Sequence, residues 1–331
     1  MSESPLLRVE GLTLGVVRKG REPVALVDDV SFSVSRGERF GIVGESGSGK
    51  SLTLRAIAGL LPSGVDVLSG EISYNGEDLR RLPAARRRAF MGPEISMIFQ
   101  EPMTALNPVM RVGRQIAEGP RRHLGLSNAE SMDLAVQMMA ATGIPDPARR
   151  ALAYPHELSG GLRQRIMIAM ALSCKPKLIL CDEPTTALDV TVQHQVLRVL
   201  EKLCSDFGTS LIFVTHDLAV VNQTCSAVAV MYAGHIIESG PVRSVFTAPR
   251  HPYTEGLLRS APDFDQPDRE LVSIPGFPPN LADRPVGCAF APRCPYVQSG
   301  CLISAPTLDH VTADERVACF ESTTVSLGVA S

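Results

Sequence analysis

The residues best suited to do chemistry form a glycine-rich stretch, GESGSGKS, which ends at Lys50 and Ser51. Its spacing fits G-x-x-x-x-G-K-[ST], in which glycines let backbone N–H groups converge on phosphate oxygens. We expect Lys50 to reach the β- and γ-phosphates of a nucleotide and the Ser51 hydroxyl to bind Mg²⁺. The other residues of the loop that are expected to contact the nucleotide are Gly44, Glu45, Ser46, Gly47, Ser48 and Gly49.

Two adjacent carboxylates, Asp182 and Glu183, follow the apolar run Leu178–Cys181. Ligands of open α/β sheets sit at the carboxyl ends of the strands, which is where this pair would lie. We expect Asp182 to hold Mg²⁺, directly or through water, and Glu183 to orient and deprotonate an attacking water. Acidic pairs after strands are also common as helix caps, but a phosphate-binding loop in the same chain favours catalysis.

A third motif is the stretch LSGGLRQ, from Leu158 to Gln164. Ser159 is an acceptable N-cap for the helix that follows. Gly160 and Gly161 weaken that helix, so helix stability does not explain them. Glycines at a helix N-terminus do suit close approach of the backbone to an anion.

In this order the motifs resemble those of the ABC ATPase family, whose signature begins LSGGQ; Leu162 stands where the commonest member has glutamine. The resemblance covers residues 5–240. It implies that the chain hydrolyses ATP with three catalytic residues, which are Glu183, Gln100 and the switch histidine His216. Gln100 would also bind Mg²⁺. It also implies that Thr186-Ala187-Leu188-Asp189 forms the D-loop.

The resemblance further implies a head-to-tail pair of ATPase subunits, with ATP between the loop of one subunit and the signature of the other. Ser159, Gly160, Gly161 and Asp189 are expected at this shared nucleotide site. The family usually has an aromatic residue that stacks on adenine near the end of the first strand. Gly15-Val16-Val17-Arg18 has none, so Val16 or Arg18 is expected to take its place.

These motifs need a scaffold, and alternating patterns of strands and helices predict one. The main strands are expected at Leu6–Val16, Val24–Val34, Phe40–Val43, Glu71–Tyr74, Ile95–Phe99, Leu178–Cys181, Leu211–Thr215 and Ala227–Tyr232. Helices are expected from Lys50 to about Leu61, from Gly160 to Cys174 and over 190–207. This alternation predicts an α/β fold with a mainly parallel sheet covered by helices.

The resemblance implies a RecA-like core with an N-terminal antiparallel β subdomain. The expected domains are a nucleotide-binding domain over 1–240, with a helical subdomain at about 103–162, and a loop-rich, cysteine-containing extension over 241–331. A net charge of −3 argues against a nucleic-acid surface. No apolar run approaches the roughly 18 residues of a membrane span, and the amino terminus lacks the features of a secretory signal. The protein is therefore expected in the cytoplasm.

The wider resemblance is to ATPase subunits of oligopeptide and dipeptide importers. It is carried by GESGSGKS, FQEPMTALNP and DEPTTALDVT, by Pro249–Thr254 and by Gly287–Pro295. It implies a second ATPase subunit, preferably a paralogue, two transmembrane permease subunits, an extracytoplasmic peptide-binding protein, and a peripheral place on the cytoplasmic face of the inner membrane. Importers of nickel or other small solutes share much of this pattern. A soluble ABC ATPase of DNA repair or translation would need a coiled-coil insertion, tandem cassettes or a basic surface, none of which is evident.

Eight cysteines divide into two groups. Cys174, Cys181, Cys204 and Cys225 lie in apolar segments and are expected as core thiols. Cys288, Cys294, Cys301 and Cys319 follow the spacing C-x5-C-x6-C-x17-C, which fits zinc sites poorly. Four thiolates suit a [4Fe–4S] cluster, which subunits of the resembled group can carry in this tail. Zinc and metal-free thiols are the alternatives.

Overall fold

The structure is a computed structural model that describes residues 4–18, 20, 22–185, 189–261 and 272–322. The chain divides into two compact units. The first comprises Met1–Val34, Arg39–Arg80 and Val214–Ser331, and the second comprises Ser35–Glu38 and Arg81–Phe213. The first unit therefore combines both ends of the chain.

An antiparallel sheet opens the first unit, with strand order β2-β1-β4-β5. In β1, Leu7 and Val9 are buried while Arg8 and Glu10 are exposed, the period of two expected of a strand with one face covered. A tight turn at Asn75-Gly76, a residue pair typical of such turns, joins β4 to β5, with φ of 50° and 80°. The strands are β1 Leu7–Val16, β2 Val24–Val34, β4 Val65–Tyr74 and β5 Glu77–Asp78.

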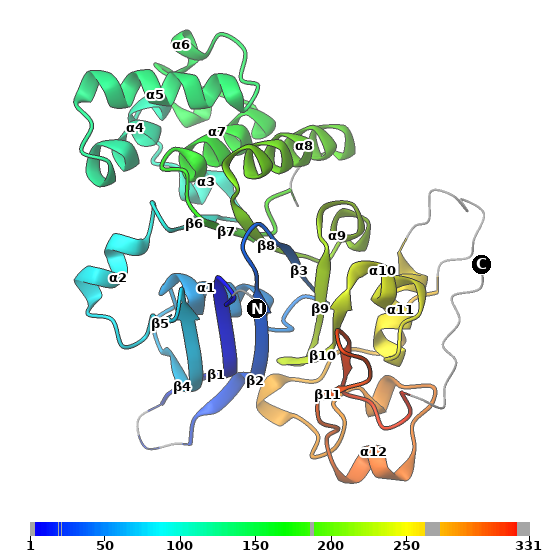
Figure 1. Ribbon diagram of the computed structural model, residues 1–331. Coiled ribbons are helices and arrows are strands. Elements are labelled where there is room, and N and C mark those ends of the chain that lie inside the picture. The colour runs from blue at the N-terminus through cyan, green and yellow to red at the C-terminus, as the bar shows by residue number, and fades with distance from the viewer. Residues whose placement is uncertain (1–3, 19, 21, 186–188, 262–271, 323–331) are drawn as a thin grey trace. The chain divides into compact units, whose positions relative to one another are not determined.

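A second set of strands in this unit runs in the order β11-β12-β10-β9-β3. Strand β3 pairs in parallel with β9, whereas β10 pairs antiparallel with both β9 and β12. The C-terminal part of the chain thus joins the same sheet as the strand before the glycine-rich loop (Figure 1). The bounds are β3 Arg39–Val43, β9 Ala227–Tyr232, β10 His235–Pro241, β11 Asp309–His310 and β12 Arg316–Val317.

Helix α1, Lys50–Ala58, ends sooner than the sequence predicts. Gly59 adopts a left-handed conformation (φ 68°), and its N–H bonds to carbonyls of the last turn, so a glycine cap ends the helix before Pro62 can. The other helices of this unit are α9 Leu218–Thr224, α10 Val242–Thr247, α11 Pro252–Ser260 and α12 Ser299–Ile303, with 3₁₀ turns η2 Leu281–Asp283 and η3 Ala291–Arg293.

The second unit is mainly helical. Helices α4, α5 and α7 pack against one another (Figure 1), and α5 begins with a capping box in which Ser127 and Glu130 bond reciprocally. Its strands lie in the order β8-β7-β6. The elements are α2 Ala84–Phe90, β6 Ile95–Ile98, α3 Pro102–Ala105, α4 Val112–His123, α5 Asn128–Ala141, α6 Pro147–Arg150, η1 Pro155–Glu157, α7 Gly160–Leu172, β7 Leu178–Asp182, α8 Val190–Phe207 and β8 Ser210–Thr215.

The predicted α/β fold is confirmed in both units, where strands alternate with helices and parallel pairs join β3 to β9 and β6 to β7. In the parts of the chain that the structure describes, no helix combines the length and the apolar character needed to cross a membrane.

Candidate functional site

The glycine-rich loop connects β3 to α1 as predicted, and its backbone favours glycine at three positions. Gly44 has φ of 149°, and a Cβ atom there would lie 2.1 Å from the carbonyl oxygen of Met231. Gly47 and Gly49 have φ of 81° and 103°, a region that other residues rarely adopt. A side chain would clash with the backbone at Gly44, and at Gly47 and Gly49 it would strain the backbone of the loop.

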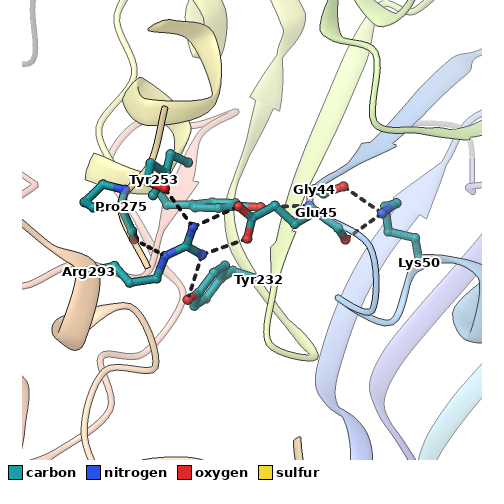
Figure 2. Close-up of polar contacts among 8 residues, drawn as sticks. Gly44, Glu45, Lys50, Tyr232, Tyr253, Pro275 and Arg293 are labelled. Carbon is teal, nitrogen blue, oxygen red and sulfur yellow. Dashed lines mark hydrogen bonds and ion pairs between the residues drawn. The ribbon is translucent and has the colours of Figure 1, made fainter. Parts of the chain in front are cut away.

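Lys50 is held against the loop although its side chain is long and charged. It is only 4% exposed, and its Nζ donates to the carbonyl oxygens of Gly44 at 2.7 Å and Glu45 at 2.9 Å (Figure 2). The ammonium thus lies at the loop, beside the N-terminus of α1. A buried cation at a helix N-terminus makes a suitable site for phosphate.

A buried ion pair links the loop to the C-terminal part of the chain. Arg293 donates from both terminal nitrogens to the Glu45 carboxylate, at 2.8 and 3.0 Å (Figure 2). Its Nε also donates to the carbonyl oxygen of Pro275 at 2.8 Å. The Arg293 side chain is 5% exposed and that of Glu45 is 28% exposed, and the carboxylate raises the pKa of the guanidinium still further. We call this contact the Glu45–Arg293 pair.

Three aromatic rings surround this pair. Ring centroids lie 4.6 Å apart for Tyr232 and Tyr253, and 5.3 and 5.5 Å from each of these to Phe290. The Tyr253 hydroxyl accepts a 2.8 Å hydrogen bond from the backbone N–H of Glu45, and burial raises the pKa of that phenol. Glu45 is thus held by both its side chain and its backbone. The sequence stretches Pro249–Thr254 and Gly287–Pro295 contain Tyr253 and Arg293, but no local pattern assigns these two residues a role at the loop.

In the second unit the structure brings Gln100 and Glu183 together. Strands β6 and β7 run parallel, so Gln100 just after β6 and Glu183 just after β7 lie at the same edge. The Gln100 side-chain nitrogen donates to a Glu183 carboxylate oxygen at 3.3 Å. Asp182, the last residue of β7, is 1% exposed. Glu183 has φ of 44°, a strained backbone of the kind found at functional sites.

The signature residues begin α7 in this same unit. Ser159 is the N-cap residue, but its side chain makes no capping hydrogen bond, so helix capping does not explain the hydroxyl. A Cβ atom at Gly161 would come within 2.8 Å of Val192 in α8, which gives that glycine a packing reason. Ser159 and Gly160 are both exposed. By contrast, the Asp189 side chain does cap its own helix, α8, by accepting a hydrogen bond from the Val192 N–H at 3.0 Å.

His216 directly follows β8, as the sequence predicts, and is exposed. Asp217, the next residue, caps α9 by accepting from two backbone N–H groups. Thr186, Ala187 and Leu188 of the expected D-loop lie outside the described residues.

The prediction of a [4Fe–4S] cluster at Cys288, Cys294, Cys301 and Cys319 is wrong. Across the described residues, no group of three or more histidine, cysteine or acidic side chains could hold a metal ion. The four cysteines do line one apolar cavity, but its volume is only about 20 Å³. Burial also raises the pKa of three of these thiols, that of Cys319 to about 11, so they favour the protonated form. The spacing of the cysteines in the sequence therefore did not predict how their thiols lie in the structure.

Two parts of the chain match known protein families. Residues 27–186 match the ABC transporter family, and residues 237–301 match the C-terminal region of oligopeptide/dipeptide transporters. The dipeptide transport ATP-binding protein DppD of Escherichia coli is 46% identical over 297 residues, covering 90% of this chain and 91% of DppD. The oligopeptide transport ATP-binding protein OppD of Salmonella typhimurium is 48% identical over 298 residues, covering 90% and 88%.

Among solved structures, the bacterial ABC transporter cassette MJ0796, determined as a dimer, resembles this chain with a TM-score of 0.64 at 26% identity. The match covers 72% of this chain and 99% of the cassette. A second dimeric structure of MJ0796, in a post-hydrolysis state with ADP and Pi, matches equally well. The chain therefore belongs to the ABC transporter family, as an ATP-binding subunit with ATP hydrolase activity.

Proposed function

We propose that this protein is one ATPase subunit of an importer that carries dipeptides or oligopeptides across the cytoplasmic membrane. The observation that carries this proposal is the C-terminal region over residues 237–301, which matches that of oligopeptide/dipeptide transporters. The names of DppD and OppD, whose sequences align over 90% of this chain, support the same cargo. Nickel or another small solute is the competing cargo, and the uptake assay below decides between them.

In this proposal the loop Gly44–Ser51 holds the phosphates of ATP, with the Lys50 ammonium at the β- and γ-phosphates. The Ser51 hydroxyl, the Asp182 carboxylate and the Gln100 side-chain oxygen would hold Mg²⁺. These are the hard oxygen ligands that Mg²⁺ prefers, and the near-complete burial of Asp182 suits a carboxylate that serves a cation. When bound, the ion would neutralise charge on the phosphates.

Hydrolysis is assigned to Glu183 as the general base for the attacking water. The hydrogen bond from Gln100 orients its carboxylate, as general-base catalysis requires. His216, exposed after β8, is proposed as the residue that contacts the γ-phosphate and reports its loss.

A second ATPase subunit, favoured as a paralogue, would complete each nucleotide site. Ser159, Gly160 and Gly161 would contact ATP held by the partner, and Asp189 would lie at the interface between subunits. The Ser159 hydroxyl, which makes no capping bond, supports this role. Two permease subunits and an extracytoplasmic peptide-binding protein would complete the importer, with the ATPase pair on the cytoplasmic face of the membrane.

The domain division that accompanies this function is a nucleotide-binding domain over 1–240, a helical subdomain at about 103–162 that meets the permeases, and an extension over 241–331. The extension shares a compact unit with the glycine-rich loop. It is therefore proposed to serve the nucleotide site and not only the assembly of the importer.

The catalytic assignment is tested with Glu183→Gln, which should bind ATP normally and hydrolyse it at least about 100-fold more slowly. Glu118→Gln, at an exposed position of α4, is the matched control and should hydrolyse ATP at the normal rate. Normal turnover by Glu183→Gln would refute the assignment. The cargo is tested in proteoliposomes that hold the whole importer, by ATP-driven uptake of labelled dipeptide, oligopeptide and Ni²⁺. Uptake of Ni²⁺ alone would refute peptide import.

A further inference from the structure

A cavity of about 420 Å³ lies beside the glycine-rich loop, entirely within the first unit. This volume falls in the range of about 300–1,000 Å³ that is typical of small-molecule pockets. One wall comes from the first two strands and the opposite wall from the C-terminal part of the chain, with loop residues between them. The apolar residues of the two walls are Val16, Val24 and Leu26, and Pro278, Pro279 and Leu281.

The C-terminal wall is fastened at both of its ends. On the N-terminal side, Arg293 donates to the Pro275 carbonyl oxygen at 2.8 Å while it pairs with Glu45 of the loop. On the C-terminal side, Arg284 donates to the Asp28 carboxylate of β2 at 3.2 Å, and its side chain is only 14% exposed. The partners of these two arginines are Glu45 of the glycine-rich loop and Asp28 of β2, and the loop and β2 also line the cavity. The wall is therefore a built part of the pocket.

The chemistry of the cavity suits the base of a nucleotide whose phosphates lie in the loop. A purine ring has two flat faces that gain from burial against apolar side chains. Val16 and Arg18, which stand where the family usually has an aromatic residue, do line this cavity. Tyr232 also lines it, but its ring packs against Tyr253 and Phe290. The two apolar walls, with Arg18 beside them, are therefore available to enclose the base.

We propose that the segment Pro278–Leu281 forms one wall of the base-binding pocket, so that the nucleotide base lies between this segment and the wall formed by Val16, Val24 and Leu26. The C-terminal part of the chain would then contribute directly to the affinity for purine nucleotides. This inference rests on the proposed placement of the phosphates at Gly44–Ser51.

The test compares two ligands that share the diphosphate and differ in the base, ADP and inorganic pyrophosphate, by calorimetry on the full chain. Leu281→Ala should weaken ADP binding about fivefold, because a leucine contact with the base is lost, and should leave pyrophosphate binding unchanged. Val286→Ala is the matched control. Val286 is 86% exposed and lies outside the cavity, so this variant should bind both ligands like the wild type.

Unchanged pyrophosphate binding also shows that the loop of the variant is folded. The inference would be overturned if Leu281→Ala bound ADP within twofold of the wild type, or if it weakened ADP and pyrophosphate equally. Failure of the wild-type protein to bind either ligand would be a different result. It would refute the phosphate site itself, and the base wall with it.

Discussion

The Glu45–Arg293 pair provides the most direct test of how the C-terminal part of the chain supports the nucleotide loop. The perturbation is Arg293→Met, which keeps an unbranched apolar stem and removes the guanidinium. Breaking a buried pair costs about 3–5 kcal/mol, because one charge is left without a partner. The Glu45 side chain is 28% exposed and can be partly hydrated, so we expect a loss of about 2 kcal/mol in local stability.

Native-state hydrogen exchange resolves this loss by segment, which suits a chain with two compact units. A loss of about 2 kcal/mol corresponds to roughly 30-fold faster exchange, and we expect it in peptides covering 272–303 and the glycine-rich loop. The double variant Glu45→Gln/Arg293→Met should recover part of the loss, since no carboxylate is then left unpaired. Arg8→Met is the control, because Arg8 and its partner Glu10 are 56% and 50% exposed.

The reasoning would be refuted if Arg293→Met accelerated hydrogen exchange no more than the control Arg8→Met does. So would a double variant whose loss is simply the sum of the two single losses, because the two side chains would then not be coupled.

Three further predictions follow from the described contacts. Gly44→Ala should lower ATP affinity at least about tenfold, because its Cβ would meet the Met231 carbonyl at 2.1 Å and distort the loop; normal affinity in a filter-binding assay would contradict this. The buried, neutral His251 has its pKa lowered by burial from 6.5 to about 3, so its contribution to stability is present above pH 6.5 and is lost as pH falls. Between pH 7 and pH 5 the free energy of unfolding of the wild type should therefore fall by about 2 kcal/mol more than that of His251→Asn, as measured by urea unfolding. Glu238 should titrate alike in both proteins and so cancel from the difference. Parallel pH profiles of the two proteins would exclude the effect. Ser127→Ala should cost about 1 kcal/mol, because it removes the N-cap of α5; an unchanged exchange rate in α5 would count against it.

Much of the nucleotide site could be predicted because its signals are local. The loop motif fixes where β3 ends and α1 begins, and segments rich in β-branched residues placed β1 and β2 within a residue of their observed bounds. The turn after β4 is also marked locally, by the Asn75-Gly76 pair, which is typical of tight turns. Each of these features depends on residues only a few positions apart.

Contacts between distant residues could not be predicted in this way. Glu45 and Arg293 are 248 positions apart, and neither side chain carries a periodic signal that points to the other. For the tail cysteines the error was the reverse. Their number and spacing predicted an iron–sulfur cluster, but the thiols are not positioned to hold a metal ion. The end of α1 was misplaced because a left-handed glycine at position 59 acts before the proline. Tertiary packing decided the first two, and a local glycine cap decided the third.

The two walls of the cavity beside the loop are made at different times during synthesis of the chain. Strands β1 and β2 leave the ribosome long before Pro278–Leu281 and the anchoring Arg293 do. Since domains tend to fold from the N-terminus as they are made, a nascent chain can form its glycine-rich loop well before its cavity is closed. Tight nucleotide binding would then begin only after Pro278–Leu281 and Arg293 have been made and have closed the cavity.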